Sequence, residues 1–164
     1  MDTQQLRDVL SRDLGRSFAG VYPRDLLPEI LPHQKAVVIN TNPHDRPGAH
    51  WVCVYLNTPV VEYFDSYGLP PRHRDIQDFI RRHGDRWMYN MHCYQALDTD
   101  VCGQYCVYYL HHRHRSGKTV RDWILPWKGT PLQRDHYVGQ WFKETFRKPR
   151  TRKGQTGQCH KLNV

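Results

Sequence analysis

The sequence predicts an α+β fold, in which helices pack on a small mixed or antiparallel sheet. Short runs rich in β-branched and aromatic residues indicate strands, and longer stretches with apolar residues three and four positions apart indicate helices. The chain has 164 residues, which is enough for one domain with a real core. Its five Trp, ten Tyr and five Phe supply bulky side chains for that core.

The N-terminal segment is expected to form an amphipathic helix. Its apolar residues fall on one face, and a glycine that can end the helix follows them: Leu6, Val9, Leu10, Leu14 and Gly15. The next stretch, residues 16–34, holds three prolines and is interpreted as an irregular connector.

Further along the chain, strand-like and helix-like patterns alternate. Strands are expected at residues 35–40, 50–56, 60–67 and 87–95, with Asn57-Thr58-Pro59 forming a hairpin connection. Helices are expected within residues 70–84, at 102–115 and at 134–147. The last of these has the apolar set Tyr137, Trp141, Phe142 and Phe146.

The composition limits the classes of protein to which this chain can belong. Lys and Arg together number 24 against 16 Asp and Glu, a surplus of eight that favours acidic partners, nucleic acid above all. No apolar run is long enough for a membrane span, and the polar start does not resemble a signal peptide. The five cysteines are irregularly spaced, so we expect a reducing compartment and no disulfide framework.

Two parts of the chain differ in composition. Residues 1–147 are expected to form the folded domain, and residues 148–164 a basic, mobile C-terminal tail. The candidate DNA contacts are clustered where the tail begins: Arg147, Lys148, Arg150, Arg152 and Lys153. A solvated tail without a ligand is the simpler alternative.

Cys102 lies where a polar loop meets an expected helix. The unpaired N–H groups and the dipole of a helix N-terminus favour a thiolate, and Gly103 leaves the thiol uncrowded. His50, at the start of a strand, is a candidate base for this thiol, and Asp65, at the end of the next strand, is a candidate to orient that histidine. If the two strands form a hairpin, the two side chains can be close.

Gln95, seven residues before Cys102, could donate to the oxyanion of an acyl transfer together with the backbone N–H of Cys102. Each residue also has an ordinary structural explanation. A buried cysteine is usually a small core residue, which is our interpretation of Cys53 and Cys106. It is the ordered set of His, Asp, Gln and Cys that favours a catalytic site.

This ordered set resembles the adenovirus-type cysteine endopeptidases, which are related to the SUMO-specific proteases. The resemblance is carried by "VINTNPHDRPGAHWVCVY" at 38–55, "VEYFDSYGL" at 61–69, and the spacing of Gln95, Cys102-Gly103 and Cys106. The ending "CHKLNV" is similar to the tail of the adenovirus enzymes.

The resemblance implies a papain-like arrangement with the nucleophile at a helix N-terminus, and a role for each site residue. Cys102 would be the nucleophile, His50 the base and Asp65 its orienting acid. Gln95 would be the oxyanion donor, with Trp51 packed beside the site. No metal or cofactor would be needed for the chemistry.

The family also implies partners. Substrates would be viral or virus-like-transposon precursor proteins such as capsid precursors, cut next to small residues. The enzyme would be a monomer in the host nucleus or cytoplasm, or packaged in virions. DNA, bound without sequence preference, and a cysteine-ended peptide would activate it.

Two departures from the adenovirus pattern are visible. The adenovirus enzymes carry Glu where this chain has Asp65, as the SUMO proteases do. Their activating peptide bonds to a cysteine well upstream of the Gln, whereas the nearest candidate here is Cys93, for which a free thiol or a strand-core residue is the simpler interpretation.

Three alternatives stay open at this point. One is a protease that removes ubiquitin-like modifiers such as SUMO. Another is a basic nucleic-acid-binding module without chemistry, which the surplus charge and the aromatic residues would fit. The third is a metal site built from Cys102, Cys106 and the histidines at 111, 112 and 114, although zinc sites usually have paired short spacings from two segments.

Overall fold

The computed structural model of the chain describes residues 1–31, 33–122 and 129–146. Its centre is a five-stranded sheet in the order β1-β2-β3-β4-β5. The outer pairs, β1 with β2 and β4 with β5, are parallel, and the inner pairs are antiparallel. The strands are β1 Phe18–Pro23, β2 Ala36–Asn40, β3 Trp51–Asn57, β4 Val60–Phe64 and β5 Arg86–Tyr89. The predicted α+β class with a mixed sheet is confirmed.

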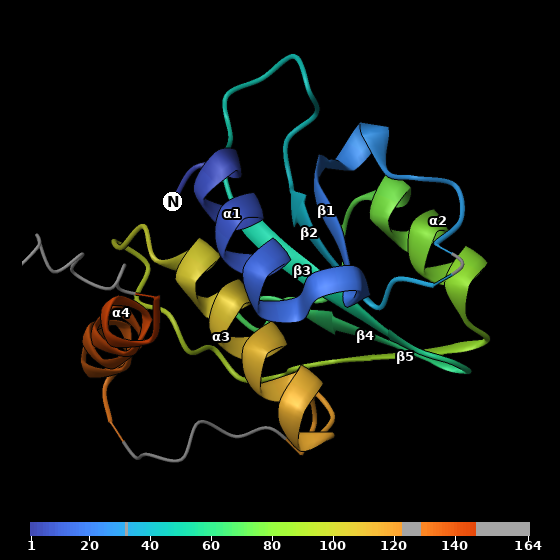
Figure 1. The fold of residues 1–164 in the computed structure, drawn as a ribbon. Coiled ribbons are helices and arrows are strands. Elements are labelled where there is room, and N and C mark those ends of the chain that lie inside the picture. The colour runs from blue at the N-terminus through green and yellow to red at the C-terminus, as the bar shows by residue number, and fades with distance from the viewer. Residues whose placement is uncertain (32, 123–128, 147–164) are drawn as a thin grey trace, which may run out of the picture.

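Helices cover both faces of this sheet. Helices α1 (Thr3–Leu14) and α3 (Cys102–Ser116) lie on one face, and α2 (Arg74–His83) lies on the other (Figure 1). The core is correspondingly divided into two apolar clusters, one on each side of the sheet. Strand β2 is covered on both faces, and all of its residues are buried. This explains why its sequence is almost continuously apolar.

The fourth helix, α4 (Pro131–Phe146), packs against α3 on the side away from the sheet (Figure 1). The ring of Trp141 contacts that of Tyr108 on α3 in an edge-on arrangement, with the centroids 4.6 Å apart. Trp141, Phe142 and Phe146 pack against the core as predicted. The prediction was wrong for Tyr137, which is 40% exposed, because the inward positions of α4 are taken by Asp135 and Val138.

Helix α1 forms where the apolar spacing predicted it. Asp2 and Gln5 make a reciprocal capping box at its start, and Gly15, with φ of 54°, ends it. The four leucines and valines of the predicted face, Leu6, Val9, Leu10 and Leu14, are all buried. The β3–β4 hairpin is likewise confirmed, with Asn57 opposite Val60.

A buried ionic network ties β4 to α3. Glu62, with no exposed surface, accepts hydrogen bonds from Nη2 of Arg113 at 2.7 Å and from the hydroxyl of Tyr109 at 2.7 Å. The backbone N–H of Val120 donates to the same carboxylate at 2.8 Å. Because its acceptor sites are satisfied, this carboxylate can be buried under the helix.

Two strand predictions were wrong. Residues 16–34 are not an irregular connector throughout, because β1 lies within them and pairs with β2. Gly20 (φ of 140°) and Pro23 hide this strand in the sequence, but an edge strand tolerates both. The strand expected over 87–95 is limited to β5. The side chain of Asn90 hydrogen-bonds the backbone of Asp65, and the chain leaves the sheet at this residue.

Within the described ranges, no helix is long and apolar enough to cross a bilayer. The expected tail, residues 148–164, and the basic cluster Arg147, Lys148, Arg150, Arg152 and Lys153 lie outside the described residues. The proposed division into a 1–147 domain and a tail therefore stays a prediction.

Candidate active site

The fold brings His50, Asp65 and the start of α3 to one end of the sheet. His50 immediately precedes β3, and Asp65 immediately follows β4. Because β3 and β4 are antiparallel neighbours, the start of β3 and the end of β4 lie at the same end of the sheet. The backbone carbonyl of His50 accepts the N–H of Thr41 at 2.9 Å, which anchors the residue beyond the end of its strand.

The histidine side chain is held between an acid and a thiol. Nε2 of His50 lies 2.9 Å from Oδ1 of Asp65, and only 17% of the histidine side chain and 6% of the aspartate side chain are exposed. The ring also hydrogen-bonds Cys102. Since Nε2 is directed to Asp65, Nδ1 is the ring nitrogen left for the thiol.

Cys102 is the first residue of α3, as the sequence predicted. Its half-buried thiol receives hydrogen bonds from His50 and from the backbone groups of Trp51 and Gly103. Burial alone would raise the pKa of this thiol, but these hydrogen bonds and the attraction to His50 outweigh it, so the pKa of Cys102 is lowered.

The electrostatics of His50 mirror those of Cys102. Burial lowers the pKa of the imidazole, but the hydrogen bonds to Asp65 and Cys102, with the attraction to both, raise the pKa of His50 to about 10. A lowered thiol pKa next to a raised imidazole pKa favours a thiolate–imidazolium pair near neutral pH.

Asp65 is fixed by neighbours that the sequence did not suggest. Its Oδ1 also accepts the backbone N–H of Tyr67 at 2.8 Å. Buried Asn90 makes two hydrogen bonds with the backbone of Asp65, accepting its N–H at 2.9 Å and donating to its carbonyl at 2.6 Å. The ring of Tyr67 stacks on His50 with centroids 4.9 Å apart, which covers the imidazole.

Trp51 and Gly103 lie beside the thiol. A Cβ atom added to Gly103 would be 3.3 Å from Cδ1 of Trp51 and 3.2 Å from Cβ of Met1, so a larger residue would crowd this position. Nε1 of Trp51 donates to the backbone carbonyl of Met1 at 3.1 Å, which fixes the indole.

Gln95 is buried in the loop that precedes α3 and is joined to the turn after β4 that carries Asp65 and Ser66. Its Oε1 accepts the hydroxyl of Ser66 at 2.7 Å, and its Nε2 donates to the backbone carbonyl of Thr99. An amide nitrogen carries two hydrogens, and no acceptor for the second one lies among the described residues. The amide therefore retains one donor.

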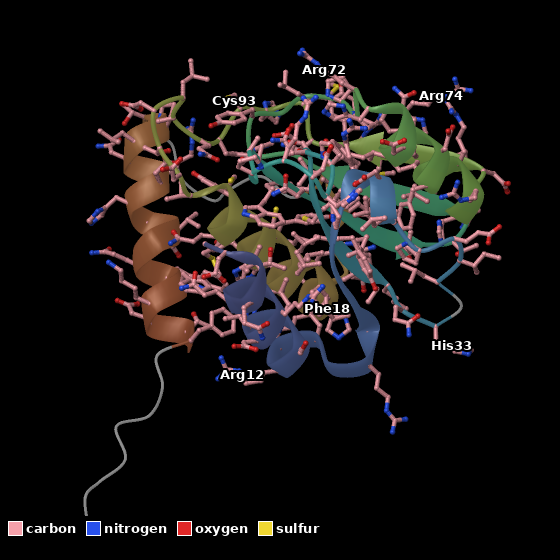
Figure 2. The ribbon with its side chains drawn as sticks, turned by 90° about the horizontal axis from the view of Figure 1, so that it is seen from above. Arg12, Phe18, His33, Arg72, Arg74 and Cys93 are labelled. Carbon is pink, nitrogen blue, oxygen red and sulfur yellow. The ribbon has the colours of Figure 1, made fainter. Side chains whose placement is uncertain are left out.

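The remaining described cysteines occupy different environments. Cys53 and Cys106 are fully buried and lie next to each other; burial and the side-chain interaction with Cys53 raise the pKa of Cys106, as expected for a core thiol. Cys93 is exposed on the loop beside α4, where Arg134 donates to its carbonyl (Figure 2). All three are free thiols.

Nothing in the described part of the chain groups three or more His, Cys, Asp or Glu side chains in a way that could hold a metal ion. The histidines of α3 have other contacts. His111 pairs with Asp13 at 3.0 Å, and the ring of His112 lies against that of Tyr108, with centroids 4.3 Å apart.

A groove opens from the thiol. It has a volume of about 640 Å³ and runs from Cys102 and Trp51 between the start of α1 and the 40–49 loop. Arg7, Tyr22 and Asp100 are among the residues that line it. Cys102 is thus part of the wall of this groove.

Comparisons with known proteins give matches at the level of structure. No family model matches the chain, and no curated protein matches its sequence. The chain is similar to the pS273R protease of ASFV, with 19% identity and a TM-score of 0.44. It is similar to ChlaDub1 from Chlamydia trachomatis, with 15% identity and a TM-score of 0.49, and to the effector protein ChlaDUB of Chlamydia abortus, with 14% and 0.48.

These matches cover 64%, 69% and 75% of this chain, in the same order. The chain spans 43%, 61% and 63% of the three solved chains, so each of them contains a substantial part that has no counterpart here.

Proposed function

We propose that this chain is a cysteine endopeptidase with Cys102 as nucleophile, His50 as base and Asp65 as the acid that orients it. One observation carries the proposal: the imidazole of His50 lies between the carboxylate of Asp65 and the thiol of Cys102, at the first turn of α3. A core cysteine would need none of these partners. The buried Cys106, one turn further along α3, has a raised pKa instead.

The chemistry follows from this pairing. The thiolate of Cys102 attacks the carbonyl carbon of the scissile amide, and the carbonyl π electrons move onto the oxygen. The C–N bond then breaks, and the leaving amine takes the proton from the His50 imidazolium. Water, deprotonated by the now neutral His50, attacks the thioester, and Cys102 leaves as the thiolate while the imidazolium forms again.

The oxyanion of each tetrahedral intermediate needs donors. In this proposal, the free N–H of the Gln95 amide and the backbone N–H of Cys102 donate to it. The Cys102 N–H is suited to this because it belongs to the first turn of α3, whose N–H groups have no partner within the helix.

The substrate class is inferred as protein rather than small molecule. The groove beside Cys102 has a volume of about 640 Å³, and it is lined by loop residues with small side chains, such as Gly48 and Ala49, together with Trp51. An extended chain with small residues near the scissile bond would fit past Trp51. No metal or cofactor takes part in the proposed steps.

The finer proposal is that the substrates are precursor proteins of a virus or a virus-like transposon, capsid precursors among them. The enzyme would then act as a monomer in the host nucleus or cytoplasm, or inside the virion, with DNA and an activating peptide as candidate partners. The competing proposal is removal of ubiquitin-like modifiers, which the use of Asp65 rather than Glu favours.

A chemical test separates the activated thiol from the other four. Iodoacetamide applied at pH 6, followed by mass spectrometry of the peptides, should modify Cys102 far faster than exposed Cys93. His50→Ala should abolish this preference, and Cys93→Ala should leave the labelling rate of Cys102 unchanged. Equal labelling of Cys93 and Cys102 would contradict the proposed thiolate.

A cleavage test then separates the two substrate classes. A capsid-type precursor and a ubiquitin-like precursor are incubated with wild-type enzyme and with Cys102→Ala. Cleavage of only the capsid-type precursor supports the maturation role, and cleavage of only the ubiquitin-like precursor supports deconjugation. Cleavage of either that persists in Cys102→Ala would show that Cys102 is not the nucleophile.

A further inference from the structure

The amide of Gln95 has one defined orientation. A backbone carbonyl can only accept a hydrogen bond, so the amide atom that faces the carbonyl of Thr99 must be the nitrogen. Oε1 then faces the Ser66 hydroxyl, which donates to it at 2.7 Å. If the amide were rotated by 180°, its oxygen would face the Thr99 carbonyl and the remaining N–H would point elsewhere.

Ser66 supports this orientation from the strand side. It follows Asp65 directly, is 1% exposed, and its backbone carbonyl accepts the N–H groups of Tyr94 and Gln95 at 2.8 and 3.1 Å. Two consecutive residues after β4 therefore contact the two halves of the candidate site: Asp65 contacts His50, and Ser66 contacts Gln95.

Asp135 supports the same loop from the opposite side. It projects from α4, is 5% exposed, and its Oδ2 accepts the backbone N–H of Ala96 at 3.1 Å and the hydroxyl of Thr99 at 2.6 Å. Its Oδ1 accepts the hydroxyl of Tyr105 at 2.8 Å. A buried carboxylate at an inward position of α4 is thus satisfied by the loop that carries Gln95 and by Tyr105 of α3.

The neighbouring residue of α4 strengthens this attachment. Nε of Arg134 donates to the carbonyl of Tyr94 at 3.1 Å, and its Nη2 donates to the carbonyl of Cys93 at 3.2 Å. Hydrogen bonds from α4 therefore reach the loop on both sides of Gln95, at residues 93 and 94 and at residues 96 and 99.

We propose that Ser66 and Asp135 are positioning residues for the oxyanion donor, Ser66 acting directly on the Gln95 amide and Asp135 acting through Thr99. Helix α4 is then part of the catalytic apparatus, although none of its described residues lines the groove. This inference rests on the proposed function, since it assigns a purpose to the orientation of Gln95.

The test uses single substitutions that each alter one hydrogen-bonding side-chain group. Ser66→Ala and Thr99→Val should lower kcat about tenfold, a part of the roughly hundred- to thousandfold loss expected when a donor is removed entirely. KM and the alkylation rate of Cys102 should stay unchanged. Asp135→Asn should act in the same direction if the protein folds, and Thr99→Val tests the same link without altering the buried charge.

Two controls distinguish positioning from general destabilisation. Tyr109→Phe removes a hydrogen bond to the buried Glu62 of β4, outside the network that holds Gln95, so it should lower the unfolding midpoint but leave kcat unchanged. Exposed Ser11→Ala should change neither quantity. A kcat loss in Tyr109→Phe as large as that in Thr99→Val would overturn the proposal.

A double-mutant cycle tests whether Ser66 and Thr99 act through Gln95. In a Gln95→Ala background, Ser66→Ala and Thr99→Val should cause no further loss of kcat, because the group they position is absent. Additive losses would overturn this inference while leaving the proposed peptidase intact. Absence of any turnover by the wild-type enzyme, on both precursor classes, would instead overturn the proposed function and this inference with it.

Discussion

Nε2 of His50 lies 2.9 Å from Oδ1 of Asp65, and the same oxygen accepts the backbone N–H of Tyr67 at 2.8 Å. The carboxylate is therefore oriented by its own turn before it contacts the imidazole. Asn90 fixes the backbone of that turn from a second direction. This makes Asp65 a rigid support for His50, with a geometry that does not depend on the thiol.

That rigidity predicts unequal effects for the two substitutions. His50→Ala removes the proton acceptor and should lower kcat/KM by roughly a hundred- to ten-thousandfold. Asp65→Asn should cost less, because an amide in this rigid turn can still orient the ring in part. Steady-state kinetics on one protein substrate measures both. A larger loss in Asp65→Asn than in His50→Ala would contradict the assigned roles.

The pH dependence of thiol reactivity is a second prediction. The pKa of Cys102 is lowered and the pKa of His50 is raised to about 10, so the thiolate–imidazolium pair should exist between those two values. The alkylation rate should rise as Cys102 deprotonates, at lower pH than for an ordinary thiol, and then level off. In His50→Ala the rise should move to higher pH. An unchanged profile in that variant would exclude the ion pair.

The sequence predicted the candidate triad because each residue stands beside a strong local signal. His50 and Asp65 flank the two strands of a hairpin, and Cys102 begins a helix that follows a polar loop. Hairpin geometry then brings the strand ends together. Local signals were weaker for β1, where Gly20 and Pro23 interrupt the apolar pattern, and the strand was missed.

The supporting residues could not be predicted in this way. Ser66 contacts Gln95, 29 positions away, and Asp135 contacts Ala96, 39 positions away. Isolated polar residues have no periodicity, and their partners are decided by how α4 and the loop pack. Asp135 in particular is buried on α4 although it lies outside the apolar set from which that helix was predicted.

Removal of the oxyanion donor is a third prediction. Gln95→Ala should lower kcat roughly a hundred- to a thousandfold with little change in KM, because the lost interaction is stronger in the transition state than with bound substrate. The alkylation rate of Cys102 should remain at the wild-type value, since the pair with His50 is untouched. A raised KM with a normal kcat would make Gln95 a substrate-binding residue instead.

A fourth prediction concerns stability away from the site. Arg113→Ala leaves the fully buried Glu62 without its cation and should lower the free energy of unfolding by roughly 3–5 kcal/mol. Arg115→Ala, two positions along α3, removes a half-exposed partner of Asp13 and should cost about 1 kcal/mol or less. Urea unfolding measures both. Equal costs would mean that the Glu62 network contributes no more than a surface pair.

The last prediction is that the basic cluster Arg147, Lys148, Arg150, Arg152 and Lys153 recruits DNA to the protease. The surplus of eight positive charges motivates it, and contacts would be mainly to phosphates, because no base-reading motif is evident. Affinity for DNA should then fall steeply with salt and vary little with sequence. Neutralising the five residues should flatten the salt dependence and remove any stimulation of cleavage by DNA.

A matched control for this prediction is available on the folded part of the chain. Five exposed arginines lie on or beside α2, two of them labelled in Figure 2: Arg72, Arg74, Arg81, Arg82 and Arg86. Neutralising these five changes the net charge by the same amount but leaves the cluster at 147–153 intact. If the cluster carries the binding, the α2 variant should retain most of the affinity and nearly the full salt slope. Equal loss of affinity in both variants would show that net charge, and not the cluster, governs binding. If the wild-type protein does not bind DNA even at low salt, the prediction is wrong.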